Sequence, residues 1–141
     1  EYLSSINMTS KYSEFDLIDS ILNQNQKKSL KILGYLRDSN VSEVFLLYLL
    51  QTEVRKFLYL RQNISPKPYI PSFKQKQYNS LMSIFEPSSL EGLIRRCFIL
   101  DKYIKSNSKM KYVWDSFEEI VVILTSSAHR DMIERRLNYE Y

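Results

Sequence analysis

The chain has 141 residues, with 20 lysines and arginines against 16 aspartates and glutamates, and a formal net charge of +4. A chain of this length forms about one domain, and 2 glycines and 4 prolines are too few for a sandwich or barrel, which needs a tight turn every ~8–12 residues. One cysteine excludes an internal disulfide, one histidine excludes most zinc sites, and the longest unbroken apolar run, at residues 44–50, is far too short to span a bilayer.

Two helices are predicted on either side of the polar stretch NQNQ at residues 23–26. Ser13 and Asp16 suit the N-terminal cap of the first helix. Asparagine caps helix starts and tolerates left-handed backbone, so a turn within NQNQ costs little, and we expect the two helices to join at residues 23–25. Gly34 lies inside the second helix and predicts another helix passing close to its backbone, unless it is only a tolerated weak position. The apolar faces of the two helices comprise Leu17, Ile18, Ile21 and Leu22, then Leu30, Ile32, Leu33 and Leu36.

A long helix is predicted over residues 42–61, opened by NVSE at residues 40–43, which resembles a capping box. Its first half, EVFLLYLL, is apolar on every side, which is typical of a helix at the centre of a bundle. Its second half narrows to Val54, Phe57 and Leu58, so this end is expected to emerge toward solvent.

Beyond an extended proline-bearing connector, NISPKPYIPSF, three more helices are predicted. The first is short and ends before Pro87, SSLE at residues 88–91 forms a second capping box for the next, and the last covers residues 112–125. Cys97 falls within an apolar stripe and is therefore expected to be a buried thiol rather than a reactive one. The stripes of these helices comprise Tyr78, Leu81, Met82 and Phe85; Leu90, Leu93, Cys97, Leu100 and Ile104; and Val113, Trp114, Phe117, Ile120, Val121 and Leu124. The predicted fold is all-α, a single bundle of five to six helices that are mostly antiparallel.

No catalytic, metal or cofactor site is predicted. The sequence contains no glycine-rich phosphate loop, GxSxG, CxxC or HExxH motif. The acidic pairs Asp16 with Asp19 and Glu118 with Glu119 are interpreted as solvated helix faces.

Basic residues are unevenly placed along the chain. Residues 54–85 contain six lysines and arginines and no acid, and residues 95–111 contain six against Asp101 alone. Basic stretches with neighbouring tyrosines suit nucleic acid, because phosphates meet the charges and bases stack on the rings. The alternatives are solvated lysine faces and tyrosines at bundle edges, where the ring is buried and the hydroxyl stays wet.

The order of these elements resembles one known family. The features are FDLIDSIL, a short break before a basic KSLKIL helix, a leucine-rich helix running into VRKFL, the helix end DKYIK, and Trp114 at the start of the last helix. Together they resemble the C-terminal domain of the delta subunit of the bacterial DNA polymerase III clamp loader.

This resemblance implies a collar domain in DNA replication. Residues 12–127 would be the helical collar domain, residues 1–11 a linker from a missing N-terminal part, and residues 128–141 a C-terminal tail, either a short helix or disordered. The domain would be a non-catalytic part of an accessory subunit of the DNA polymerase holoenzyme in the bacterial cytoplasm. Its partners would be the other clamp-loader subunits in a ring, with the sliding clamp bound only through the missing domains.

Candidate contact residues follow from the resemblance and from residue type. If the loop at residues 105–112 faces the chamber that holds primer-template DNA, Lys105, Lys109 and Lys111 would meet phosphate and Tyr112 could stack on a base, although a plain surface loop is the alternative. Tyrosine is enriched in interface cores, which makes Tyr48, Tyr59 and Tyr103 the candidates for the ring contacts. Two other functions stay open, a free-standing basic helical nucleic-acid-binding domain and a regulatory adaptor bundle.

Overall fold

The computed structural model describes residues 11–106 and 110–126, and within these ranges it contains six α-helices, one short 3-10 helix and no β-strand. The elements in chain order are α2 (Glu14–Leu22), α3 (Gln26–Asp38), α4 (Glu43–Gln62), the 3-10 helix η1 (Ser72–Lys74), α5 (Gln75–Met82), α6 (Pro87–Lys105) and α7 (Met110–Leu124). The predicted all-α bundle is therefore confirmed. The predicted linker and tail lie almost wholly outside the described residues.

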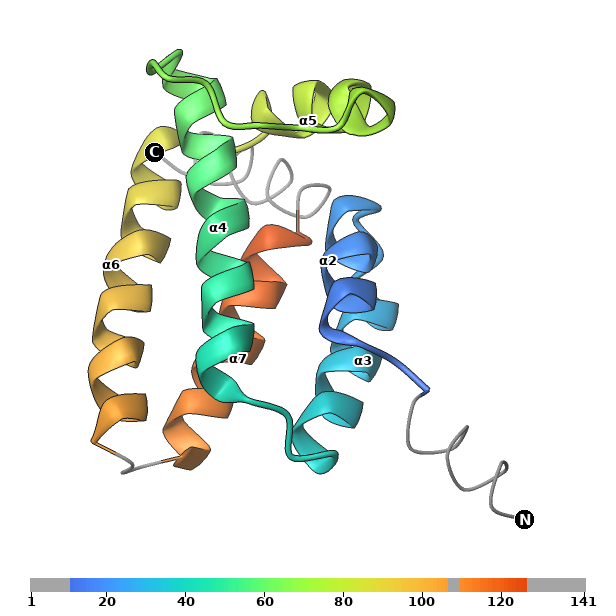
Figure 1. Ribbon diagram of the computed structural model, residues 1–141, viewed down its shortest axis with the longest axis vertical. Helices are drawn as coiled ribbons and strands as arrows, with labels where there is room; N and C mark the ends of the chain where they lie inside the picture. The colour runs from blue at the N-terminus through green and yellow to red at the C-terminus, as the bar shows by residue number, and fades with distance from the viewer. Residues whose placement is uncertain (1–10, 107–109, 127–141) are drawn as a thin grey trace, which may run out of the picture.

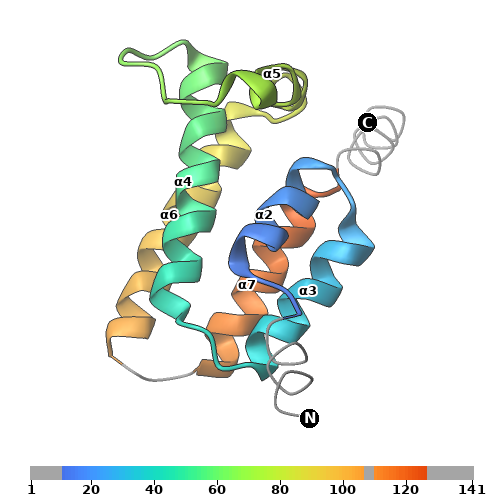
Figure 2. The same cartoon turned by 45° about the vertical axis from the view of Figure 1, so that its right-hand side comes forward.

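The helices form two antiparallel pairs with α7 between them (Figure 1). One pair is α2 with α3 and the other is α4 with α6, and α7 packs against both α3 and α6. Figure 2 shows α4 and α6 on one side of α7 and α3 on the other, with α2 drawn in front of α7 and α5 lying across the C-terminal end of α4. The pairs also meet directly, because α2 packs against α4. Most neighbours are antiparallel, as predicted, because short connections return the chain beside the preceding helix.

The first two helices meet in the turn that the polar stretch predicts. Ser13 and Asp16 form both bonds of a capping box at the start of α2. Gln24 takes the left-handed conformation, with φ 57°, and the Asn25 side chain accepts a hydrogen bond from the Lys28 backbone at 3.1 Å to begin α3. The prediction of two helices joined at residues 23–25 is confirmed.

The glutamines of this turn also fix the last helix. Gln24 Nε2 donates to the Leu124 carbonyl at 2.8 Å, and Gln26 Nε2 donates to Thr125 Oγ1 at 3.2 Å. The final carbonyls of any helix lack partners within the helix. The turn between α2 and α3 therefore satisfies part of the C-terminal end of α7, some 100 residues away in sequence.

One apolar core joins all six helices. Cys97 is 1% exposed within the α6 stripe, which confirms that its thiol is buried. Trp114 and Ile104 are only partly buried, at the margin of this core. The core residues on α4, α6 and α7 are Leu46, Leu47, Leu50, Val54, Phe57 and Leu58; Leu90, Leu93, Cys97 and Leu100; and Val113, Phe117, Ile120, Val121 and Leu124.

Both later capping boxes were predicted at the wrong residue. At the start of α4 the cap is Ser42, whose side chain accepts from the Phe45 backbone at 3.2 Å, while Asn40 adopts a positive φ of 56° in the preceding turn. At the start of α6, Pro87 occupies the first turn after Glu86, which makes no side-chain capping bond. Proline is preorganised for this position, so the helix begins before the predicted serine cap.

Two further expectations from the sequence are wrong. The first half of α4 is not covered on every side, since Val44 is 58% exposed and Tyr48 is 60% exposed. No close packing occurs at Gly34, because a Cβ built there would meet none of the described residues within 4 Å, which fits the alternative of a tolerated weak position. The connector after α4 begins at Asn63, which ends the helix in left-handed backbone, and it is held by buried Ile70.

Candidate docking surfaces

An aromatic patch covers the N-terminal ends of α2 and α4. It comprises Phe15, Val44, Phe45 and Tyr48, whose exposed fractions are 58%, 58%, 38% and 60%. The rings of Phe15 and Phe45 meet edge to face with centroids 6.0 Å apart, and Phe45 stacks on Tyr48 at 6.5 Å. Three of the four residues of the patch thus form a continuous series of ring contacts across two helices.

A second exposed apolar pair, Phe98 and Ile99, lies on α6 and is about half exposed. Exposed Arg95 and Lys102 flank it at three residues on either side, which places them close by on the helix surface. We call these two apolar residues the α6 pair.

A groove runs along α4 beside the proline-bearing connector, and we call it the α4 groove. It encloses about 510 Å³ and contains two of the three tyrosines predicted for ring contacts, Tyr48 and Tyr59. Both are exposed, and both line the groove together with connector residues. Its lining is Tyr48, Thr52, Arg55, Lys56, Tyr59, Pro66, Lys67, Pro68 and Tyr69.

The third predicted interface tyrosine joins the predicted DNA-contact end. Tyr103 is partly buried against the core, and its ring centroid lies 4.9 Å from that of Tyr112, which is 44% exposed. Lys105 ends α6 with its ammonium 2.8 Å from Asp101, and Lys111 is exposed at the start of α7. The fourth candidate, Lys109, lies outside the described residues. This end of the bundle therefore gathers Tyr103, Tyr112, Lys105 and Lys111 between two adjacent helices.

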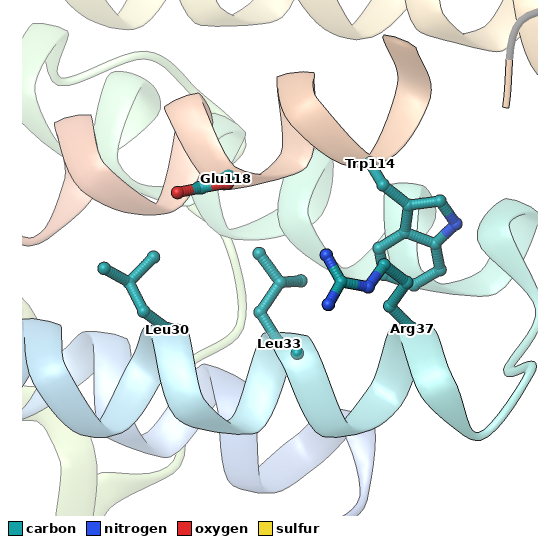
Figure 3. A pocket seen from close by; sticks show the side chains of 6 residues that line it. Leu30, Leu33, Arg37, Trp114 and Glu118 are labelled. Atoms are coloured by element: carbon teal, nitrogen blue, oxygen red, sulfur yellow. The ribbon is translucent and has the colours of Figure 1, made fainter. Parts of the chain in front are cut away.

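A small pocket opens between α3 and α7 (Figure 3). Leu30 and Leu33 rise from α3 toward α7, Trp114 closes one end, and Gly34 contributes bare backbone. Glu118 lies on the α7 side, and Arg37 completes the lining. Its volume of about 190 Å³ is below the roughly 300–1,000 Å³ typical of small-molecule sites, so the pocket is too small for such a ligand.

A polar cluster in which the pKa of a tyrosine is strongly raised is buried between α4 and α5. Tyr78, 2% exposed, donates a hydrogen bond to the carboxylate of Glu53, which is 4% exposed. Lys56 Nζ lies 3.1 Å from the other carboxylate oxygen and 5.5 Å from the centre of the Tyr78 ring. Burial, then the hydrogen bond to Glu53, raises the pKa of Tyr78 well above its ordinary value. Glu53 and Tyr78 are buried while Lys56 lines the α4 groove, and the three side chains together join α5 to α4.

The predicted solvated carboxylates are exposed on their helices. Glu119 pairs with Arg96 of α6, and Glu118 borders the small pocket without being enclosed by it. Asp16 caps α2, and Asp19 pairs with Lys74 at 3.3 Å. Among the described residues, no three His, Cys, Asp or Glu side chains are arranged to hold a metal ion. None of the described helices is both long and apolar enough to cross a membrane.

Most of the exposed apolar and aromatic residues were not predicted from the sequence. The aromatic patch and the α6 pair each had a signal in the sequence nevertheless. EVFLLYLL places apolar residues on all sides of α4, and the neighbouring helices cover only part of that surface. In CFIL at residues 97–100, Cys97 and Leu100 face the core, so Phe98 and Ile99 between them point outward. Tyr69, 83% exposed in the connector, is one of the tyrosines beside basic residues, the pattern that suits base stacking. The missed residues are Phe15, Val44, Phe45, Phe98 and Ile99.

Comparison with known proteins gave no relative: no protein-family profile, curated protein or solved structure matches the chain.

Proposed function

We propose that this chain is a docking module, the C-terminal collar domain of a delta-type subunit of a bacterial DNA polymerase III clamp loader. Its function would be to join neighbouring subunits in the ring that loads the sliding clamp during DNA replication. Two things support this proposal, the ordered sequence resemblance over residues 12–127 and the exposed aromatic surface of the bundle.

The aromatic patch is the observation that carries the proposal. Soluble monomers rarely expose contiguous apolar patches beyond a few hundred Å², and larger patches mark interaction sites. Phe15 and Phe45 touch across two helices and remain exposed. A partner that covered them would gain roughly 25 cal/mol for every Å² of apolar surface removed from water. Aromatic residues are enriched at protein interfaces, where each partner buries about 800 Å².

The α6 pair supplies a second surface. A subunit inside a ring contacts two neighbours, so it needs two separate contact areas. Phe98 and Ile99 lie on a different helix from the aromatic patch, with basic neighbours suited to an acidic rim on the partner.

The experiment mixes the 141-residue chain with the other clamp-loader subunits and measures the mass of the assembly by light scattering. The native chain is expected to enter a multi-subunit assembly. The double variant Phe15→Ser/Phe45→Ser is expected to weaken entry at least about 30-fold, since interface hot spots cost 2 kcal/mol or more. The control is Phe73→Ser, which alters a side chain 82% exposed on η1, outside both surfaces.

Two outcomes would contradict the proposal. A native chain that stays monomeric with all loader subunits present would favour an adaptor bundle with a different partner. Equal assembly of the native chain and the double variant would remove the aromatic patch from the contact.

The predicted DNA contact, where α6 ends and α7 begins, stays part of this proposal. Lys105 is the last residue of α6, where Asp101 partly neutralises it, and Lys111 precedes Tyr112 at the start of α7. In the full loader, replacing Lys105, Lys109 and Lys111 by alanine is expected to reduce DNA affinity while assembly is retained. Unchanged DNA affinity at low salt would contradict the contact, and lost assembly would assign these lysines to the ring.

A further inference from the structure

The α4 groove combines positive charge with exposed aromatic rings, a combination that ring assembly does not require. Tyr48, Thr52, Arg55 and Tyr59 follow one another at spacings of four, three and four along one face of α4. From the first to the last this face extends over about 16 Å. Pro66, Lys67, Pro68 and Tyr69 of the connector form the opposite wall.

The charge of the groove is positive. Arg55 and Lys67 are both exposed, and neither forms an ion pair with any other residue in the described part of the chain. Lys56 also lines the groove, but its ammonium is held by the buried carboxylate of Glu53 at 3.1 Å. No aspartate or glutamate lines the groove, and none occurs anywhere in residues 54–85. An anion in the groove would therefore meet two uncompensated cations and no opposing charge.

The rings of the groove are presented to solvent on both walls. Tyr59 is 36% exposed on α4, and Tyr69 is 83% exposed on the connector. A single strand of nucleic acid binds to aromatic rings that lie beside basic residues, because its bases stack on the rings while its phosphates contact arginine and lysine. An acidic peptide would use the cations and leave the rings unused, and a proline-rich peptide would use the rings and leave the cations unused.

We infer that the α4 groove is a binding site for single-stranded nucleic acid. Arg55 and Lys67 bind backbone phosphates, and Tyr59 and Tyr69 stack on bases. Tyr48, which belongs to both the aromatic patch and the groove lining, is not needed for this binding. The site uses none of the residues proposed for DNA contact at the end of α6 and α7.

The test titrates the 141-residue chain into a fluorescent oligothymidylate of about twelve nucleotides, within the roughly 4–16 nucleotides of known single-strand sites. Anisotropy is measured from low to moderate salt, and oligouridylate of the same length distinguishes DNA from RNA as the natural strand. Tyr59→Ala and Tyr69→Ala are each expected to weaken binding by about 5- to 150-fold. Tyr59→Phe and Tyr69→Phe retain the rings and are expected to bind almost as the native chain does. Arg55→Gln/Lys67→Gln is expected to lower the slope of log affinity against log salt by about 0.7 for each charge removed.

Three controls make the outcome decisive. Lys27→Gln/Lys31→Gln removes the same charge from exposed positions on α3, across the molecule from the outer face of α4 (Figure 2). Lys105→Gln/Lys111→Gln removes two positive charges where α6 ends and α7 begins. Polyglutamate serves as the competitor for an acidic protein.

The inference is overturned if the native chain does not bind, or if the groove variants and the α3 variant lose equal affinity. It is also overturned if polyglutamate displaces the strand as effectively as unlabelled oligothymidylate does. Loss confined to the Lys105 and Lys111 variant would also overturn it. Binding by this chain alone leaves ring assembly untested, so the two proposals fail independently.

Discussion

The hydroxyl of Tyr78 on α5 donates its hydrogen bond to the carboxylate of Glu53 on α4, and both side chains are almost fully buried. Lys56, one turn further along α4, places its ammonium against the second carboxylate oxygen. A carboxylate enclosed in a protein needs such partners, since an unpaired buried charge is strongly destabilising. This cluster therefore holds the short helix α5 across the end of α4 (Figure 1).

Tyr78→Phe is expected to lower the free energy of unfolding by about 1–3 kcal/mol, because it leaves one buried carboxylate oxygen without its donor. Urea denaturation monitored by circular dichroism measures the change. Tyr59→Phe is the matched control, since it removes a hydroxyl from an exposed ring and is expected to change stability by less than about 0.5 kcal/mol. Equal stability of Tyr78→Phe and the native chain would show that the hydrogen bond contributes nothing net.

The free energy of unfolding is expected to fall above about pH 9. Burial raises the pKa of the Cys97 thiol from 9.0 to about 11, and burial raises the pKa of Tyr78 as well. Both groups are neutral when protonated, and the folded chain holds these protons more tightly than the unfolded chain. Their stabilising contribution is therefore complete below the unfolded pKa and is lost as pH rises through the folded pKa.

For Cys97 this loss lies between pH 9 and about 11, at up to about 1.4 kcal/mol for each pH unit. Urea titrations at steps across this range measure it. Cys97→Val keeps an apolar side chain of similar size and removes the thiol, so its stability is expected to decline less steeply. Parallel curves for the native chain and the variant would contradict a buried, proton-retaining thiol.

Gly34→Ala is expected to raise the free energy of unfolding by about 0.5–1 kcal/mol, since glycine inside a helix costs about that much relative to alanine. The added methyl would meet no side chain or backbone atom of residues 11–106 and 110–126 within 4 Å. Gly92→Ala on α6 is the matched variant, where the new Cβ would lie 3.8 Å from the Arg95 guanidinium, an ordinary contact. Thermal melts of both variants measure the changes. Destabilisation by Gly34→Ala alone would contradict the open space beside Gly34.

Helix positions and core faces could be predicted from the sequence because they depend on local periodicity. The turn at NQNQ follows in part from the preferences of asparagine, since Asn25 caps α3, but the residue in left-handed backbone is Gln24 rather than an asparagine. The caps of α4 and α6 were misplaced because several residues in a row can cap a helix. Which of them does so depends on the path of the preceding turn, and sequence spacing leaves that path open.

The candidate surfaces were harder to predict for a different reason. An apolar residue can face the core or a partner, and residue type alone does not separate the two. Phe45 and Phe98 became visible as surface residues only once the neighbouring helices were placed around them. The α4 groove depends on the fold of the connector against α4, which brings Tyr69 opposite Tyr59 without any regular spacing between them. The predicted ring tyrosines Tyr48 and Tyr59 are exposed, and their role in a ring stays a prediction.

Site-specific photo-crosslinking tests the docking function most directly. A benzophenone amino acid replaces Phe45, Phe98 or Phe73 in turn, and each variant is irradiated with the other clamp-loader subunits present. A collar domain predicts a cross-link from position 45 to one loader subunit, a cross-link from position 98 to a different one, and none from position 73. Cross-links from positions 45 and 98 no stronger than those from position 73 would contradict a collar function for this bundle.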